Sequence, residues 1–308
     1  MARTVFIDGG AGTTGLEIIA RLEAHPELTP VVLEDDRRKD AEARRAAFNE
    51  ADFAVLCLPD AAAREAVELI DPESKVRVVD ASSAHRCASG WIYGFPELVG
   101  KRVVAGAERV SNPGCYASGF LALIAPLVRS RLLPAEWPYT VHAVSGYSGG
   151  GKGLIERYED DPDLAYRAYA LRLGHKHLPE MQQKAGLKHP PVFCPAVVPT
   201  HRGMIVEVPL ALEAMPTAAS PAQMRDELEA YYSESRLVTL RREAPEELLL
   251  LRSAQGSDRM DLYVFAEEKG GQARLVAVLD NLGKGASGAA VQSLNLMAEC
   301  EETAGLRV

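Results

Sequence analysis

The chain has 308 residues, and its 43 acidic against 34 basic residues give a net charge of −9. An acidic balance excludes a general binder of nucleic acid or of anionic membranes, whose surface would be basic. A length of this order predicts two domains, with one large barrel as the alternative.

The cysteines are odd in number and scattered: Cys57, Cys87, Cys115, Cys194 and Cys300. Without a Cys-x-x-Cys pair, they indicate neither a disulfide framework nor a zinc site. The first residues lack the basic and apolar segments of an export signal, and no run of about 18 apolar residues occurs. We therefore expect a cytoplasmic protein that spans no membrane and binds no metal.

The first third of the chain alternates strand-like with helix-like segments. Strands are expected at residues 4–8, 31–33, 51–59 and 76–80. This alternation predicts an α/β domain with a Rossmann-type, doubly wound parallel sheet.

A glycine-rich turn follows the first expected strand. Gly10, Gly12 and Gly15 have the spacing of the dinucleotide fingerprint, and apolar residues at helical spacing come next. The missing Cβ atoms let the backbone approach a pyrophosphate seated on the helix N-terminus. Cofactor contacts are expected from Gly9, Gly10, Gly12, Thr13, Thr14 and Gly15.

The end of the second expected strand bears on the choice of cofactor. A carboxylate there accepts from the ribose 2′-hydroxyl of NAD, whereas an arginine accommodates the 2′-phosphate of NADP. The chain offers both, because residues 34–36 are acidic and Arg37, Arg38 and Lys39 follow. The pattern favours NADP(H), with Thr13, Thr14, Arg37 and Arg38 beside the 2′-phosphate, and NAD stays the alternative.

A polar loop, residues 80–86, follows the fourth expected strand. Open α/β sheets bind ligands at this edge. Arg86 either holds a substrate anion there or is a surface arginine.

Residues 111–119 place one thiol at a helix start. Pro113 and Gly114 end the preceding segment, and a buried helix is expected from Cys115. Unpaired N–H groups and the helix dipole at such a position favour a thiolate. Cys115 is therefore a candidate nucleophile, although an isolated cysteine is also a common small core residue.

A second glycine-rich turn, residues 145–153, follows a strand-like run. It nearly matches the phosphate-binding P-loop, but Gly153 replaces the Ser or Thr that would bind magnesium, so nucleotide hydrolysis is rejected. Its N–H groups, around Ser148 and Gly149, can cradle a substrate phosphate or an oxyanion.

Two histidines, His175 and His177, precede a helix expected to have Pro179 in its first turn. A cysteine enzyme needs a proton donor that titrates near neutrality, so we interpret this pair as a general acid and base rather than a zinc site. Which histidine moves the proton stays open.

The last part of the chain predicts a second domain with a mixed or largely antiparallel sheet. Arg202 lies in a turn between strands and can clamp a carboxylate or phosphate. A third glycine-rich turn, residues 280–288, can face the cofactor through Asn281, Gly283 and Gly285. Strands are expected at residues 191–198, 205–210, 248–251, 260–266 and 273–280.

A nicotinamide site and a thiolate in one protein suit the interconversion of an aldehyde and an activated acyl group. The thiolate displaces phosphate from an acyl phosphate, the thioester accepts hydride, and a histidine moves a proton as the aldehyde leaves.

These motifs, above all Asn112-Pro113-Gly114-Cys115-Tyr116, occur in the order of a known family. Over essentially its whole length the chain resembles the short form of N-acetyl-γ-glutamyl-phosphate reductase of arginine biosynthesis. The related aspartate-semialdehyde dehydrogenases usually have the thiol directly after Asn.

The resemblance implies NADPH-dependent reduction of N-acetyl-γ-glutamyl phosphate, with Cys115 as nucleophile and His175 as acid and base. It places His177, Glu180 and Arg202 in the substrate pocket. It also implies a nucleotide domain of residues 1–114 and 283–308, a substrate domain of residues 115–282, and a homodimer or homotetramer. Another acyl-phosphate reductase and a nicotinamide-binding regulatory protein are the alternatives.

Overall fold

The computed structural model describes residues 2–308, which form two compact units. The first unit ends at Pro113 and resumes over Ala286–Arg307, and the second is Gly114–Gly285. The division expected from the sequence assigned Gly114 and residues 283–285 to the first unit instead. In the structure a Cβ on Gly283 would lie 1.8 Å from the Ser257 carbonyl oxygen, so this turn packs closely within the second unit.

The first unit is built on a six-stranded sheet in the order β2-β1-β3-β4-β6-β5, and every pairing is parallel. Its strands are β1 (Arg3–Asp8), β2 (Leu28–Val31), β3 (Phe53–Leu56), β4 (Arg77–Asp80), β5 (Ile92–Tyr93) and β6 (Arg109–Ser111). Its helices are α1 (Thr13–Glu23), α2 (Ala41–Glu50), α3 (Asp60–Glu68), α4 (Pro96–Val99), α5 (Lys101–Ala105) and α10 (Gly288–Met297). The predicted doubly wound parallel sheet is confirmed.

Alternate strand residues face opposite sides of this sheet, as strand geometry requires. Val5 and Ile7 pack with α1, α5 and α10, whereas Phe6 packs with α2 and α3. Both faces are thus covered, which explains the nearly continuous apolar runs of the central strands.

The second strand lies earlier in the chain than predicted. It spans Leu28–Val31 rather than residues 31–33, and Arg3 pairs with Leu28. Because β2 is an edge strand, Pro30 and its missing N–H are tolerated. Val32 and Leu33 leave the ladder and line a cavity instead.

The second unit is built on a seven-stranded mixed sheet in the order β11-β12-β13-β10-β7-β9-β8. Its strands are β7 (Thr140–Gly146), β8 (Arg167–Ala168), β9 (Val192–Val198), β10 (Met204–Ala211), β11 (Val238–Leu240), β12 (Met260–Ala266) and β13 (Gln272–Leu279). Its helices are α6 (Cys115–Arg129), α7 (Lys152–Asp160), α8 (Leu178–Ala185) and α9 (Pro221–Tyr231). Short helical turns occur at Tyr147–Gly150, Leu212–Ala214 and Gly283–Ser287.

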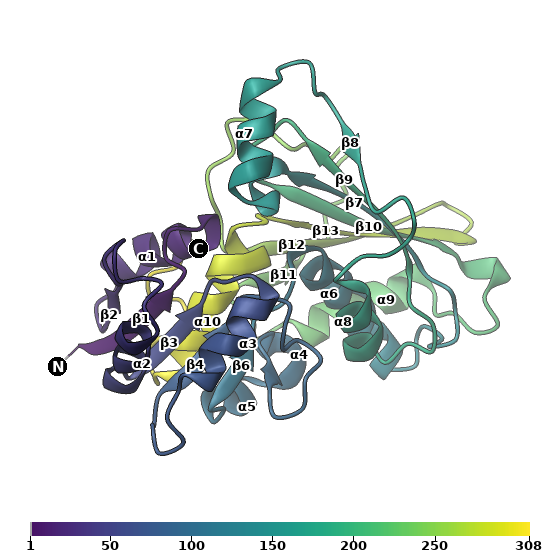
Figure 1. Ribbon diagram of the computed structural model, residues 1–308. Coiled ribbons are helices and arrows are strands. Elements are labelled where there is room, and N and C mark those ends of the chain that lie inside the picture. The colour runs from purple at the N-terminus through teal and green to yellow at the C-terminus, as the bar shows by residue number, and fades with distance from the viewer. Residues whose placement is uncertain (1) are drawn as a thin grey trace. The chain divides into compact units, whose positions relative to one another are not determined.

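Helix α6 is the core of the second unit. It packs on β10 and β13 with α8 and α9 beside it, on one side of the sheet (Figure 1). Its residues 116–127 are all buried, as expected for a helix that is apolar all round. Gly119 permits the close approach, because a Cβ there would lie 2.7 Å from Cγ2 of Val206.

The strand predicted at residues 248–251 is wrong. These leucines form no regular structure, and Leu249 and Leu251 are more than half exposed. The place beside β12 is taken by β11, which pairs with it in parallel, so the apolar run does not pair with β12. No helix within residues 2–308 is long and apolar enough to cross a membrane.

Candidate active site

The Cys115 thiol belongs to the first turn of α6, so the predicted helix start is confirmed. Gly114 is the N-cap in extended conformation (φ −77°, ψ 143°), and no side chain caps the helix. Cys115 is partly exposed although the residues that follow it are buried. The positive end of this helix favours a negative charge at the sulfur.

Two groups fix the start of this helix. Gly285 packs directly on the cysteine, since a Cβ at residue 285 would lie 2.9 Å from the Cβ of Cys115. The Gly114 N–H donates to Oε2 of Glu180 at 3.1 Å, and this carboxylate is buried. Glu180 thus joins α8 to the cysteine turn, while its contact with substrate stays a prediction.

The two predicted histidines lie beside this turn. The aromatic ring of Tyr116, next to the thiol in the chain, lies 6.0 Å from the His175 ring and 5.9 Å from the His177 ring, between centroids. His177 is buried at the N-cap of α8, which confirms that the pair precedes the helix.

Hydrogen bonds determine the tautomer of His175. Its Nδ1 lies 3.1 Å from the backbone nitrogen of His177, whose N–H can only donate, so Nδ1 accepts. The neutral ring therefore carries its proton on Nε2, 3.3 Å from the hydroxyl of Tyr169. Burial, with the charge of Cys115 adding, raises the pKa of Tyr169 to about 12, so this hydroxyl keeps its proton at neutral pH.

Three predicted turns meet on the second unit. Asn281 donates to Oγ of Ser148 at 2.9 Å and accepts from the Gly203 N–H at 3.0 Å. A Cβ on Gly149 would touch Asn281 at 3.4 Å. Asn281, predicted to contact the cofactor, therefore also ties the Ser148 turn to the turn that carries Arg202.

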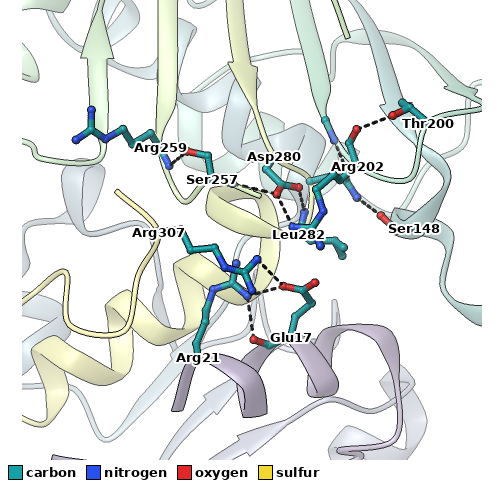
Figure 2. Close-up of polar contacts among 12 residues, drawn as sticks. Glu17, Arg21, Ser148, Thr200, Arg202, Ser257, Arg259, Asp280, Leu282 and Arg307 are labelled. Atoms are coloured by element: carbon teal, nitrogen blue, oxygen red, sulfur yellow. Dashed lines mark hydrogen bonds and ion pairs between the residues drawn. The ribbon is translucent and has the colours of Figure 1, made fainter. Parts of the chain in front are cut away.

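Arg202 is held by an ion pair (Figure 2). Its Nη1 lies 3.0 Å from Oδ2 of Asp280, and both side chains are largely buried. The N–H groups of Ser257 and Leu282 also donate to this carboxylate. The guanidinium is thus oriented in advance, as recognition of a carboxylate or phosphate requires.

In the first unit, the predicted glycine turn connects β1 to α1. Gly9 has φ +88°, and a Cβ there would lie 2.3 Å from the Cys57 carbonyl oxygen. A Cβ on Gly15 would lie 2.8 Å from the Cα of Gly10. Gly12 is the N-cap of α1 without a side-chain cap, and Thr13 and Thr14 begin the helix. This open helix N-terminus fits a pyrophosphate.

A cavity of about 520 Å³ opens beside the glycine turn, within the first unit. Arg38 and Lys39 line it, whereas Arg37 is exposed and is not among its lining residues. Arg44, which the sequence interpretation passed over, also lines it.

Arg86 is buried rather than on the surface, and its Nε donates to the carbonyl of Asn112 at 3.0 Å. Asn112 in turn donates from Nδ2 to the Ala286 carbonyl at 2.9 Å. In the same loop, buried Asp80 lies 2.6 Å from Nδ1 of His85. Arg86 therefore holds the segment before Pro113, and its contact with substrate stays a prediction.

Sequence interpretation missed Tyr169, Arg44 and Asp80. No spacing rule brings Tyr169 to His175 or Arg44 to the cavity. Asp80 had a usable signal, since it ends a buried strand at the ligand-binding edge of the sheet.

Both parts of the chain match known families. Residues 4–105 match the semialdehyde dehydrogenase NAD binding domain, and residues 115–281 match the semialdehyde dehydrogenase dimerisation domain. The chain is 45% identical to the N-acetyl-gamma-glutamyl-phosphate reductase of Trichormus variabilis over 98% of both chains. It is 47% identical to N-acetyl-gamma-glutamyl-phosphate reductase 2 of Pseudomonas putida, over 95% of this chain and 96% of that one.

The chain belongs to the N-acetyl-γ-glutamyl-phosphate reductase family. The family resemblance predicted from the motifs is confirmed, and so is the assignment as an oxidoreductase. In its fold, this reductase is similar to aspartate semialdehyde dehydrogenase II of Vibrio cholerae, with a TM-score of 0.71 and 16% identity over 97% of this chain and 99% of that one. At that identity the likeness shows the fold alone.

Proposed function

We propose that this chain reduces N-acetyl-γ-glutamyl phosphate to its semialdehyde with NADPH, releasing phosphate, in arginine biosynthesis. The observation that carries the proposal is the thiol at the open N-terminus of α6, with His175 packed on the neighbouring Tyr116 ring. The first unit serves the dinucleotide, and the second unit carries the thiol and the substrate groups.

The thiolate of Cys115 attacks the acyl carbon, the carbon–oxygen bond to phosphate breaks, and a thioester forms as phosphate leaves. NADPH, when bound, supplies the hydride that reduces the thioester carbon. The carbon–sulfur bond then breaks, releasing the aldehyde and restoring the sulfur. The uncapped end of α6 stabilises the thiolate before attack and after release.

His175 gives the proton on Nε2 to the oxygen of the acyl carbon as hydride adds, and takes it back when the carbon–sulfur bond breaks; Nδ1 accepts the His177 N–H and carries no proton in the neutral ring. Tyr169 positions this ring from the Nε2 side. Arg202, oriented by Asp280, takes an anionic group of the substrate, and the N–H of Gly149 takes another. The Ser148 N–H already donates to the His201 carbonyl at 3.2 Å, so Ser148 contributes its side chain.

We also place the protein in the cytoplasm as a homodimer. None of the five cysteines forms a disulfide, which suits a reducing compartment. On β10, alternate residues are buried under the helices, and the others, such as Ile205 and Glu207, line a groove of about 510 Å³ on the opposite face. Phe265, stacked on Tyr263, lies in the same face. A second copy of this face is the partner that would cover it, and the matched dimerisation domain supports this.

The assay is phosphate-dependent NADP⁺ reduction with either N-acetylglutamate semialdehyde or aspartate semialdehyde. We expect turnover with the first, abolished in Cys115→Ser and kept in the control Cys194→Ser, which alters an exposed cysteine. Activity only with aspartate semialdehyde would refute the proposed substrate, and an active Cys115→Ser would refute the proposed mechanism.

Phe265→Lys should yield monomers in analytical ultracentrifugation if the sheet face forms the dimer.

A further inference from the structure

The cavity of the first unit combines an apolar floor with a cationic edge. Leu16, Ile19 and Val32 supply apolar surface beside the glycine turn. Arg38, Lys39 and Arg44 are the cations among its described lining residues. Such a cavity can take a planar apolar group together with an anion.

Arg44 is the least exposed of these cations. It lies in α2, and its Nη2 and Nε approach Oδ2 of Asp8 at 2.6 and 3.2 Å. The Arg44 side chain is 14% exposed and that of Asp8 is 5% exposed. Burial raises the pKa of Asp8, and the hydrogen bond and charge of Arg44 oppose that shift. The pair therefore holds the guanidinium at the cavity before any ligand arrives.

Arg38 is placed differently. Its Nε lies 3.2 Å from Asp35, but its side chain is 48% exposed and that of Asp35 is 91% exposed. Water screens a charge in that setting, whereas a largely buried guanidinium interacts more strongly with an anion. Arg44 also pairs with the Asp8 carboxylate, which would otherwise repel a phosphate in the cavity.

The position of Arg44 in the fold indicates which phosphate it meets. In parallel sheets of this kind the pyrophosphate lies on the first helix, and the adenosine ribose lies at the end of the second strand. Arg44 belongs to α2, the helix after β2, and shares the cavity with Val32 and Leu33 from the end of that strand.

We infer that Arg44, oriented by Asp8, is the residue that lets this cavity prefer the 2′-phosphate of NADP over the ribose 2′-hydroxyl of NAD. The inference rests on the dinucleotide use in the proposed function but not on the identity of the acyl phosphate. It assigns to a residue of α2 the role that the sequence pattern gave to Arg37 and Arg38.

The test is calorimetric binding of NADP⁺, NAD⁺, 2′,5′-ADP and 5′-AMP to the purified protein. Arg44→Gln should weaken binding of the two 2′-phosphorylated ligands about 10- to 100-fold, the range of a charged hydrogen bond. It should change binding of NAD⁺ and 5′-AMP by less than about 3-fold. The matched control is Arg45→Gln, because Arg45 pairs with Asp71 and does not line the cavity.

Arg44→Gln leaves Asp8 as a buried unpaired carboxylate and can lower stability. Asp8→Asn with Arg44→Gln removes both charges, and compared with Asp8→Asn alone it should show the same selective loss. Equal losses for NADP⁺ and NAD⁺, or no loss, overturn the inference. A wild-type protein that binds neither dinucleotide would instead overturn the proposed function.

Discussion

Replacing Gly285 by alanine tests whether the thiol position depends on the glycine turn. The new Cβ would lie 2.9 Å from the Cβ of Cys115 and 3.0 Å from the carbonyl oxygen of Asp280. Carbon atoms in contact normally stay about 3.5–4.0 Å apart, so the two carbons must separate by about 0.6 Å or more. That oxygen cannot give way easily, because it accepts the N–H groups of Gly283 and Gly285. The cysteine backbone is therefore the part that shifts.

Overpacking of this size costs about 1–3 kcal/mol of folding free energy. A reacting group displaced by up to 1 Å lowers the rate by up to about 100-fold. We expect Gly285→Ala to fold, to melt at a lower temperature, and to lose about 10- to 100-fold in kcat/KM. The measurements are steady-state kinetics and thermal unfolding.

The matched control is Gly106→Ala, whose Cβ would meet its nearest described neighbour, the Arg102 carbonyl oxygen, at an ordinary 3.5 Å. It should keep wild-type kinetics. If Gly285→Ala keeps wild-type kcat/KM while its melting temperature falls, the strain is absorbed away from the thiol and the reasoning is refuted.

Three further outcomes are expected. Tyr169→Phe should lower kcat about 10-fold, shift the pH profile and leave KM nearly unchanged, because the hydroxyl positions Nε2 of His175; an unchanged pH profile contradicts this. Desolvation lowers the pKa of His25 in the folded chain, so the unfolded chain binds a proton at this ring more tightly. The free energy of unfolding should therefore fall as the pH drops below 6.5, and it should fall less in His25→Gln. Thermal unfolding at two pH values measures both effects. At neutral pH, iodoacetamide should modify Cys115 before the more exposed Cys194, as mass spectrometry of the digested protein can report; the opposite order would show that accessibility alone decides.

Local pattern was enough for the sheet type of the first unit and for the order of the motifs, although β2 lies earlier in the chain than predicted. The strand, glycine turn and helix around Gly9 to Gly15 each follow from short-range rules. The alternation of strands and helices indicates a parallel sheet. The helix start at Cys115 also follows from its Pro-Gly flank. These features depend on neighbours in the chain, so the sequence predicts them.

Three-dimensional packing decided the rest. The apolar run at residues 248–251 looks like a strand, but β11 occupies the sheet edge beside β12. Tyr169 meets His175 only because β8 and the residues after it run beside β9. Asp8 and Arg44 are 36 residues apart and belong to different elements, and only their packing makes one ion pair at the cavity. The sequence by itself determined which chemical groups are present, and the fold decided which of them are desolvated, paired and aimed at a ligand.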